Sequence, residues 1–245
     1  MLPIGDANPT RRRPVMTWLL IAANVVMFLY EIQMSARTLD RFILAWGVVP
    51  RNVLAAFANP FAPGALHVFE TLITSQFLHG GWLHLIGNML FLYIFGDNIE
   101  DVVGSLGYLV FYLFCGVAAA LAQSFILAPL LGQHAVPMIG ASGAIAGVLG
   151  AYLVLYPTAR VSVLIPVLII LLPIDLPAFV LIGWWFIQQF FYSLLSLTPT
   201  VAQSGGTAFW AHVGGFVTGL MLIVPFIDRA RRRAGGNTDR YRQLA

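Results

Sequence analysis

Long apolar runs separated by short polar stretches dominate the hydropathy pattern of this chain. A helix rises about 1.5 Å per residue, so about 20 apolar residues cross the hydrocarbon core of a bilayer. The pattern predicts an all-α membrane protein with six transmembrane helices. The predicted spans are about Val15–Tyr30, Trp82–Phe95, Leu106–Leu127, a fourth that contains Ser142 and ends at Tyr156, Ala178–Leu197 and Ala208–Ile227.

Three boundaries between these spans need separate interpretation. Residues Gln33–Leu78 are too polar and proline-interrupted for a span, yet they are rich in apolar side chains. We therefore expect a long folded loop, partly embedded in the membrane, between the first two spans. The second span is expected to stop at the acidic stretch that begins with Asp97. Val161–Leu172 is too short to cross and ends at Pro173, so we expect an interfacial segment or a distorted lead-in to the fifth span.

Composition supports the membrane assignment. The chain is 59% hydrophobic and 9% charged, with a mean hydropathy of +0.84, which excludes an ordinary soluble domain. Its single cysteine, Cys115, excludes an intramolecular disulfide framework. The formal net charge is +3 and every basic residue is an arginine. Most arginines lie in the two terminal segments, which indicates membrane orientation and argues against nucleic-acid binding.

The same charges predict the domain organisation. Six spans place both ends of the chain on one side of the membrane, and the side rich in arginine is normally cytoplasmic. We therefore predict a cytoplasmic N-terminal tail over residues 1–14, one membrane core over residues 15–227 and a basic cytoplasmic tail over residues 228–245. Arg160, between the fourth and fifth spans, falls on the same side.

Four polar side chains on three of the predicted spans lie at a similar depth. Counted up from the cytoplasmic end of each helix, Ser142 lies at roughly 21 Å, His212 at roughly 24 Å, His84 at roughly 20 Å and Asn88 at roughly 14 Å. Polar residues inside a span are costly and often functional. Their agreement in depth points to a single site.

The types of these residues indicate nucleophilic catalysis. Ser142 needs a base to become a nucleophile, and His212 is the only histidine in the spans that follow it. Small residues let two helix backbones approach closely, as a serine–imidazole hydrogen bond between helices requires. Such faces occur on the fourth span at Gly143 and Gly147, and on the sixth at Ala211, Gly215 and Gly219.

His84 and Asn88 are four residues apart, so both project from one face of the second span. Two side-chain donors beside a nucleophile suit the oxyanion of a tetrahedral intermediate. Taken singly, each of the four residues has a purely structural explanation: Ser142 could pack between helices, His212 could be a core histidine, and the other two could join helices by hydrogen bonds. Their combination favours catalysis. His79, at the mouth of the second span, is expected to brace the loop.

Three motifs occur in a characteristic order: Phe77–Asn88 (FLHGGWLHLIGN), Gly140–Gly143 (GASG) and Ala211–Gly215 (AHVGG). Together they resemble the rhomboid intramembrane serine proteases, over about Val15–Ile227. The resemblance implies the six-helix rhomboid bundle and a serine endopeptidase.

The resemblance also implies roles for individual residues. Ser142 and His212 would form a catalytic dyad with no third acidic member. The oxyanion site would be His84, Asn88 and the backbone N–H of Ser142. Substrates would be single-span membrane proteins, cut within or next to the span near its outer end. We expect no metal or cofactor, and we place the protein in a bacterial plasma membrane.

Two positions depart from common family residues. Many members carry Trp-Arg at the end of the first loop, where this chain has Glu70-Thr71, so the bracing of the loop is in question. Some members stack an aromatic residue from the fourth span on the dyad histidine. Ala146 occupies that position here, which leaves open how His212 is held.

Other classes of protein fit less well. A zinc protease would carry His-Glu-x-x-His, which does not occur in this sequence. An aspartyl protease needs two aspartates in mid-membrane, whereas Asp97 and Asp175 lie at the ends of predicted spans. An inactive rhomboid relative that binds membrane clients would lack the serine or the histidine. A small transporter would show paired broken spans and buried charges.

Overall fold

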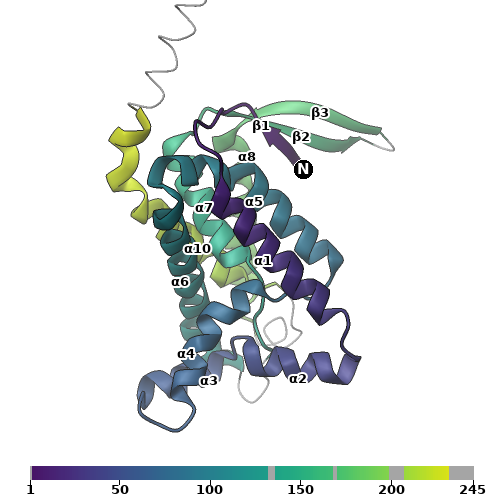
Figure 1. Cartoon of the computed structure of the whole chain (residues 1–245), viewed down its shortest axis with the longest axis vertical. Helices are drawn as coiled ribbons and strands as arrows, with labels where there is room; N and C mark the ends of the chain where they lie inside the picture. The colour runs from purple at the N-terminus through teal and green to yellow at the C-terminus, as the bar shows by residue number, and fades with distance from the viewer. Residues whose placement is uncertain (1, 132–135, 168–169, 199–206, 232–245) are drawn as a thin grey trace, which may run out of the picture.

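The helix that begins at Ser142 lies inside a bundle. The computed structural model describes residues 2–131, 136–167, 170–198 and 207–231, and it places α7 (Ser142–Leu155) among the other long helices (Figure 1). Every residue of α7 from Gly143 to Tyr152 is buried. The glycines and alanines of this sequence explain the position, because small side chains let neighbouring helices approach.

Five further apolar helices correspond to the other predicted spans. They are α1 (Val15–Glu31), α5 (Trp82–Val103), α6 (Ser105–Leu131), α8 (Ala178–Leu195) and α10 (Phe209–Leu222). Within the described residues, three helices are long and apolar enough to cross a membrane, and a bent pair that includes α5 could form a fourth crossing. The helices α1 and α7 are apolar but shorter. The predicted helical membrane bundle is confirmed, and the number of six spans stays a prediction.

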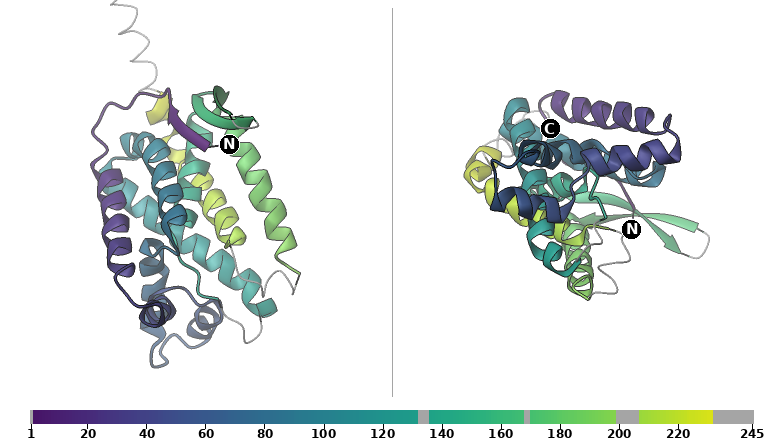
Figure 2. Two further views of the ribbon diagram at one scale, coloured as in Figure 1. Left: turned by 90° about the vertical axis from the view of Figure 1, so that its right-hand side faces the viewer. Right: turned by 90° about the horizontal axis from the view of Figure 1, so that it is seen from below.

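The segment between α1 and α5 is folded, as expected. It contains α2 (Ala36–Trp46), α3 (Pro50–Ala58), α4 (Ala65–Thr74) and the short 3₁₀ helix η1 (Ser75–Phe77). These helices lie together at one end of the bundle (Figures 1 and 2). Two backbone hydrogen bonds between Val48 and Met138, of 2.9 and 2.7 Å, join the loop to the segment that leads into α7. The loop thereby helps to fix the position at which α7 begins.

A three-stranded antiparallel sheet lies at the opposite end (Figure 1). Its strands are β1 (Leu2–Asp6), β2 (Arg160–Val167) and β3 (Ile170–Pro177), in the order β1-β2-β3. Residues 161–167 and 170–172 therefore lie in paired strands, which differs from the expected interfacial segment or distorted lead-in. The β-branched and aliphatic residues of this segment favour strands, and their backbone groups pair within the sheet.

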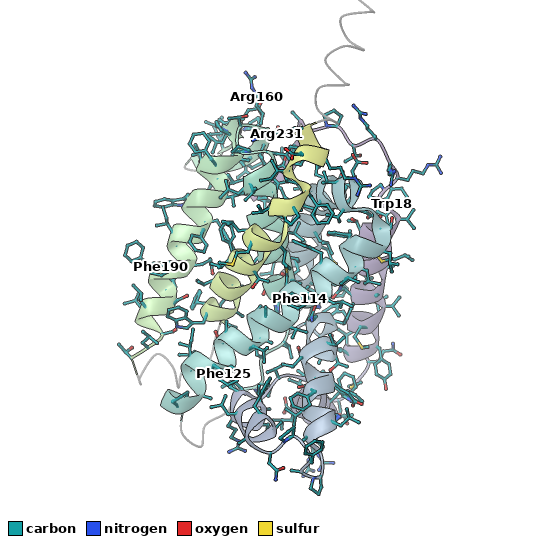
Figure 3. All side chains as sticks on the ribbon, turned by 90° about the vertical axis from the view of Figure 1, so that its left-hand side faces the viewer. Trp18, Phe114, Phe125, Arg160, Phe190 and Arg231 are labelled. Atoms are coloured by element: carbon teal, nitrogen blue, oxygen red, sulfur yellow. The ribbon has the colours of Figure 1, made fainter. Side chains whose placement is uncertain are left out.

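The N-terminal segment, expected only as a tail, supplies an edge strand of this sheet. The Asp6 carboxylate fixes it to the bundle, because Oδ2 accepts hydrogen bonds from the Tyr152 hydroxyl at 2.5 Å and from Asn98 Nδ2 at 3.3 Å. Burial raises the pKa of Asp6 above its ordinary value. Arg160 and Arg231 lie at the same end of the molecule (Figure 3). Most of the predicted C-terminal tail, residues 232–245, lies outside the described residues.

The helix α5 continues past the acidic stretch at which we expected it to stop. It ends at Val103. The helix continues because Glu100 is buried and bonds to α1 instead of facing solvent at a helix end. The Glu100 carboxylate accepts hydrogen bonds from the backbone N–H groups of Met16 and Thr17 at 2.9 and 2.8 Å, and from the Ser105 hydroxyl at 2.5 Å. It therefore satisfies donors that the start of a helix leaves without an intrahelical partner.

The predicted small-residue faces of α7 and α10 meet in direct backbone contact. A Cβ atom added at Gly215 or Gly219 would collide with the carbonyl groups of Gly143 or Gly147 on α7. A Cβ atom at Gly143 would lie 2.6 Å from the Ala119 side chain of α6. Glycine is needed at these positions because the backbone atoms opposite cannot rotate away as a side chain can.

We expect Gly219→Ala to lower stability by about 1–3 kcal/mol, because the added methyl group must separate two helix backbones. Gly183→Ala is the matched control, since a Cβ atom at this helical glycine of α8 has no neighbouring atom within 4 Å. The control should be neutral or stabilising by up to about 1 kcal/mol. Thermal unfolding of the purified variants in detergent measures both. Equal stability of the two variants would contradict the close approach of α7 and α10.

Candidate active site

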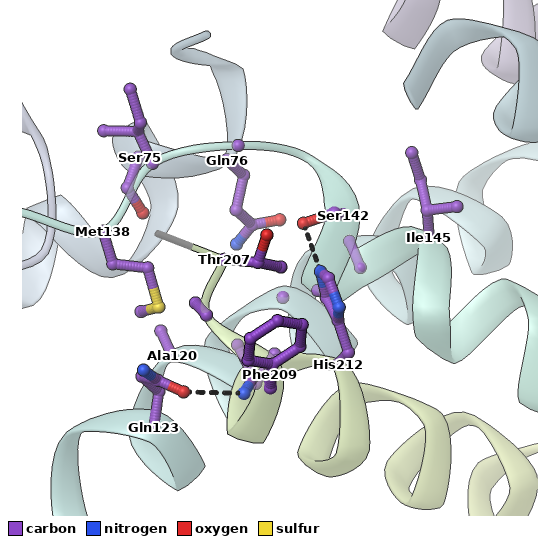
Figure 4. A pocket seen from close by; sticks show the side chains of 18 of the residues that line it. Ser75, Gln76, Ala120, Gln123, Met138, Ser142, Ile145, Thr207, Phe209 and His212 are labelled. Carbon is purple, nitrogen blue, oxygen red and sulfur yellow. Dashed lines mark hydrogen bonds between the residues drawn. The ribbon is translucent and has the colours of Figure 1, made fainter. Parts of the chain in front are cut away.

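Ser142 and His212 are in hydrogen-bond contact. Ser142 is the first residue of α7, and His212 lies in the first turn of α10. The distance between Ser142 Oγ and His212 Nε2 is 2.8 Å (Figure 4). The histidine is buried, with 7% of its surface exposed, and the serine is partly exposed. The structure therefore brings together a hydroxyl and an imidazole from segments 70 residues apart.

The start of α10 is held by a side chain of a third helix. Gln123, on α6, accepts a hydrogen bond from the backbone N–H of Ala211 through its Oε1 atom, at 3.1 Å (Figure 4). The same N–H also faces the Ala208 carbonyl at 3.0 Å, so it is shared between the backbone and the Gln123 side chain. The bond fixes the turn that carries His212.

His84 lies on the first turn of α5, beside the segment that leads into α7. Gly140 has a φ of +121°, and a Cβ atom there would lie 2.7 Å from His84 Nε2. Only glycine therefore suits this position, both for its backbone conformation and for the space beside the imidazole. The Gly140 N–H donates to the Ser75 carbonyl at 2.8 Å, which holds the segment in place.

Asn88 is oriented by His79, which the sequence analysis had assigned to loop bracing alone. Asn88 Nδ2 lies 3.0 Å from His79 Nε2, and both side chains are buried. The His79 backbone N–H faces the buried Glu31 carboxylate, 3.2 Å from its Oε2. An amide nitrogen carries two hydrogens, so this contact leaves one Asn88 hydrogen for another acceptor.

All four predicted site residues line one cavity of about 740 Å³. Ser142, His212, His84 and Asn88 reach it from α5, α7 and α10, and Gln76 and Gln123 add amide groups to its wall. The backbone N–H of Ser142 belongs to the first turn of α7, which leaves it free of an intrahelical acceptor. A space of this size, with polar groups converging on a hydroxyl, is typical of a site that binds a substrate.

Two residues of α8 that the sequence did not predict as site residues also contact His212. Gln189 Oε1 lies 2.7 Å from His212 Nδ1, and the Trp185 ring centre lies 5.7 Å from the imidazole centre. The sequence does indicate a polar role for this part of α8, because Gln188 and Gln189 are adjacent amides in a largely apolar span. Trp185 and Gln189 are four residues apart and so project from one face of α8.

The two departures from common family residues have different surroundings. Ala146 is fully buried inside the bundle. Glu70 is exposed and contacts His67, with 3.3 Å between Oε2 and Nδ1. Thr71 is buried, and its hydroxyl donates to the Val68 carbonyl within α4 at 2.6 Å. Within the described residues, the end of the loop is fixed by the Glu31–His79 contact described above and by backbone bonds.

Several known proteins are similar to this chain in sequence. The chain is 34% identical to rhomboid protease GluP of Bacillus subtilis over 142 residues, which is 58% of this chain and 24% of that protein. It is 43% identical over 75 residues to the chloroplastic rhomboid-like protein 11 of Arabidopsis thaliana, which is 31% of this chain and 25% of that protein. It is 27% identical over 172 residues to mitochondrial rhomboid protein 1 of Saccharomyces cerevisiae, covering 66% and 44% of the two chains.

The matched region spans less than half the length of each of these relatives. A model of the rhomboid domain matches residues 67–229, which include Ser142, His212, His84 and Asn88. This match covers most of the described bundle, from α4 to the end of α10. The chain belongs to the rhomboid family.

Proposed function

We propose that this protein is an intramembrane serine endopeptidase in which Ser142 and His212 form the catalytic dyad. The contact of 2.8 Å between Ser142 Oγ and His212 Nε2 carries the proposal. A nucleophile and its base must lie within such a distance, and the pair lines a cavity large enough for a peptide segment. Family membership supports the same reaction, because rhomboid proteins include intramembrane serine proteases.

The chemistry follows from the positions of these groups. Ser142 Oγ attacks the carbonyl carbon of the scissile peptide bond while His212 Nε2 accepts the hydroxyl proton. The imidazolium then gives this proton to the leaving amine, and water, activated by the same imidazole, hydrolyses the acyl-enzyme. The oxyanion of each tetrahedral intermediate is stabilised by the Ser142 backbone N–H, His84 and the Asn88 hydrogen that His79 leaves free.

Single-span membrane proteins are the proposed substrates. The start of α7 lines the cavity, and this end of α7 lies away from the end of the bundle that carries the sheet, Arg160 and Arg231 (Figures 1 and 3). If that basic end is cytoplasmic, as arginine-rich ends normally are, cleavage occurs near the outer end of the substrate span. We propose a bacterial plasma membrane with both ends of the chain cytoplasmic as the location.

Ser142→Ala should abolish cleavage of a single-span model substrate, with a loss of at least about 10³-fold in kcat. A fluorophosphonate should label the wild-type protein at Ser142 and should not label this variant, because the probe needs an activated hydroxyl.

His212→Ala should lose both cleavage and labelling while keeping the wild-type unfolding temperature within a few degrees. Undiminished cleavage by Ser142→Ala would support the alternative that another group, or a contaminant, cuts the substrate. A wild-type protein that binds the substrate but neither cuts it nor reacts with the probe would support an inactive client-binding relative.

Asn88→Ala should lower kcat by about 10²–10³-fold with little change in KM, because an oxyanion donor acts only in the transition state. Asn52→Ala, an exposed position on α3, is the matched control and should keep wild-type kinetics. Steady-state cleavage of a fluorogenic transmembrane substrate measures both parameters. A rise in KM with unchanged kcat would show that Asn88 binds the substrate uniformly and would contradict the oxyanion role.

A further inference from the structure

The imidazole of His212 has two ring nitrogens with different partners. Nε2 faces Ser142 Oγ at 2.8 Å and Nδ1 faces Gln189 Oε1 at 2.7 Å. If Nε2 is to accept the serine proton, the ring must carry its own proton on Nδ1. The group at Nδ1 therefore decides which ring nitrogen carries the proton, and so whether Nε2 can accept the proton of Ser142.

We propose that Gln189 is the positioning residue of the dyad histidine: its Oε1 accepts the Nδ1 proton of His212 and so directs the unprotonated Nε2 to Ser142. This inference rests on the proposed function and goes beyond it, because it adds a third residue to the catalytic unit from α8. The opposite amide orientation would present an N–H to Nδ1 and move the ring proton to Nε2, where it would block proton transfer from Ser142.

A neutral acceptor suits this place in the fold. His212 is buried, and the helix that faces it is apolar on most of its surface. A carboxylate at the Gln189 position would orient the imidazole equally well, but a buried charge in a membrane span is costly. An amide oxygen satisfies the Nδ1 proton without that cost, and it also stabilises the imidazolium that forms during each turnover.

The Trp185 ring supports the same geometry. It lies against the imidazole with 5.7 Å between centres and an angle of 37° between the ring planes. At the α7 position where the family resemblance implies an aromatic cover for the imidazole, this chain has only the methyl group of Ala146. Trp185 and Gln189 therefore hold the plane and the rotation of the His212 ring from α8, one helical turn apart.

The contacts of Gln189 and Trp185 with His212 depend on the packing of α8 against α10. Only Ala178, Leu181, Ile182 and Ser193 are buried along α8. Phe186 stacks on Phe216 of α10 with 4.3 Å between ring centres, which keeps α8 next to the histidine. A displacement of α8 away from α10 would remove both the Nδ1 acceptor and the ring contact, so we expect the activity of the dyad to fall when α8 is displaced.

Three variants of neighbouring glutamines test the proposal. Gln189→Met keeps the length of the side chain and removes the acceptor. Gln189→Glu restores an acceptor oxygen at the same reach. Gln188→Met is the matched control, because Gln188 lines a separate cavity with Trp184 and Leu181. Each is measured for kcat, KM, unfolding temperature and the rate of Ser142 labelling by a fluorophosphonate, in the full-length protein.

Gln189→Met should lower kcat and the labelling rate together by about 10- to 100-fold, the range expected when a hydrogen bond to a group that becomes charged is lost. KM should stay within about twofold, and the unfolding temperature should match that of Gln188→Met. Gln189→Glu should recover most of the loss, and Gln188→Met should keep wild-type rates. The labelling rate separates positioning from substrate access, because the probe has no transmembrane helix.

Wild-type kcat and labelling in Gln189→Met would overturn the proposal, as would a Gln189→Glu variant no more active than Gln189→Met. If Gln189→Met does not fold, Gln189→Asn carries the same expectation, because it keeps the amide and shortens its reach by one carbon. Failure of the inference is distinct from failure of the proposed function. An inactive Ser142→Ala protein with a fully active Gln189→Met protein rejects only the positioning role, whereas an active Ser142→Ala protein rejects the dyad itself.

Discussion

The direct backbone contact between α7 and α10 is the constraint on which the rest of the structure depends. A hydroxyl and an imidazole are short side chains, so a hydrogen bond between them forces their helices together. Three glycines of α7 (Gly143, Gly147 and Gly150) and two of α10 (Gly215 and Gly219) meet here and leave no side chain between the backbones. Van der Waals contact over this area holds the helices where lipid offers no hydrophobic driving force. Ser142 and His212 lie at one end of this contact, so their separation is set by the packing of both helices.

His212, the turn that carries it and Asn88 each contact a polar side chain from another segment. Gln123 fixes the first turn of α10, and Gln189 contacts the ring nitrogen of His212 that faces away from Ser142. His79 orients Asn88. Amide and imidazole partners recur because a polar group that is buried without a partner costs several kcal/mol in an apolar medium. These hydrogen bonds therefore hold the site residues in place and supply the polar partners that lipid does not offer.

The sequence predicted the parts of the molecule that follow from periodicity, length and spacing. The helical membrane bundle, the folded first loop and the small faces of α7 and α10 all depend on local composition, which hydropathy and residue size report directly. The sheet was not predicted, because β1 and β2 are more than 150 residues apart and their pairing is a property of the fold. Gln189 was missed for a related reason. An amide in an apolar span signals a polar partner, but only the packing of α8 on α10 identifies that partner as His212.

The placement of charge along the bundle bears on the proposed dyad of Ser142 and His212. Two of the buried carboxylates among the described residues, Glu31 at the end of α1 and Glu100 near the end of α5, accept hydrogen bonds from backbone N–H groups of neighbouring segments. At a helix end a carboxylate can accept hydrogen bonds from several backbone N–H donors. Next to His212, an ionised third residue would orient the ring but would lower the stability of the fold through its desolvation. A neutral side chain that accepts one proton gives the orientation without the charge, and the helix that supplies it then governs whether the histidine can act.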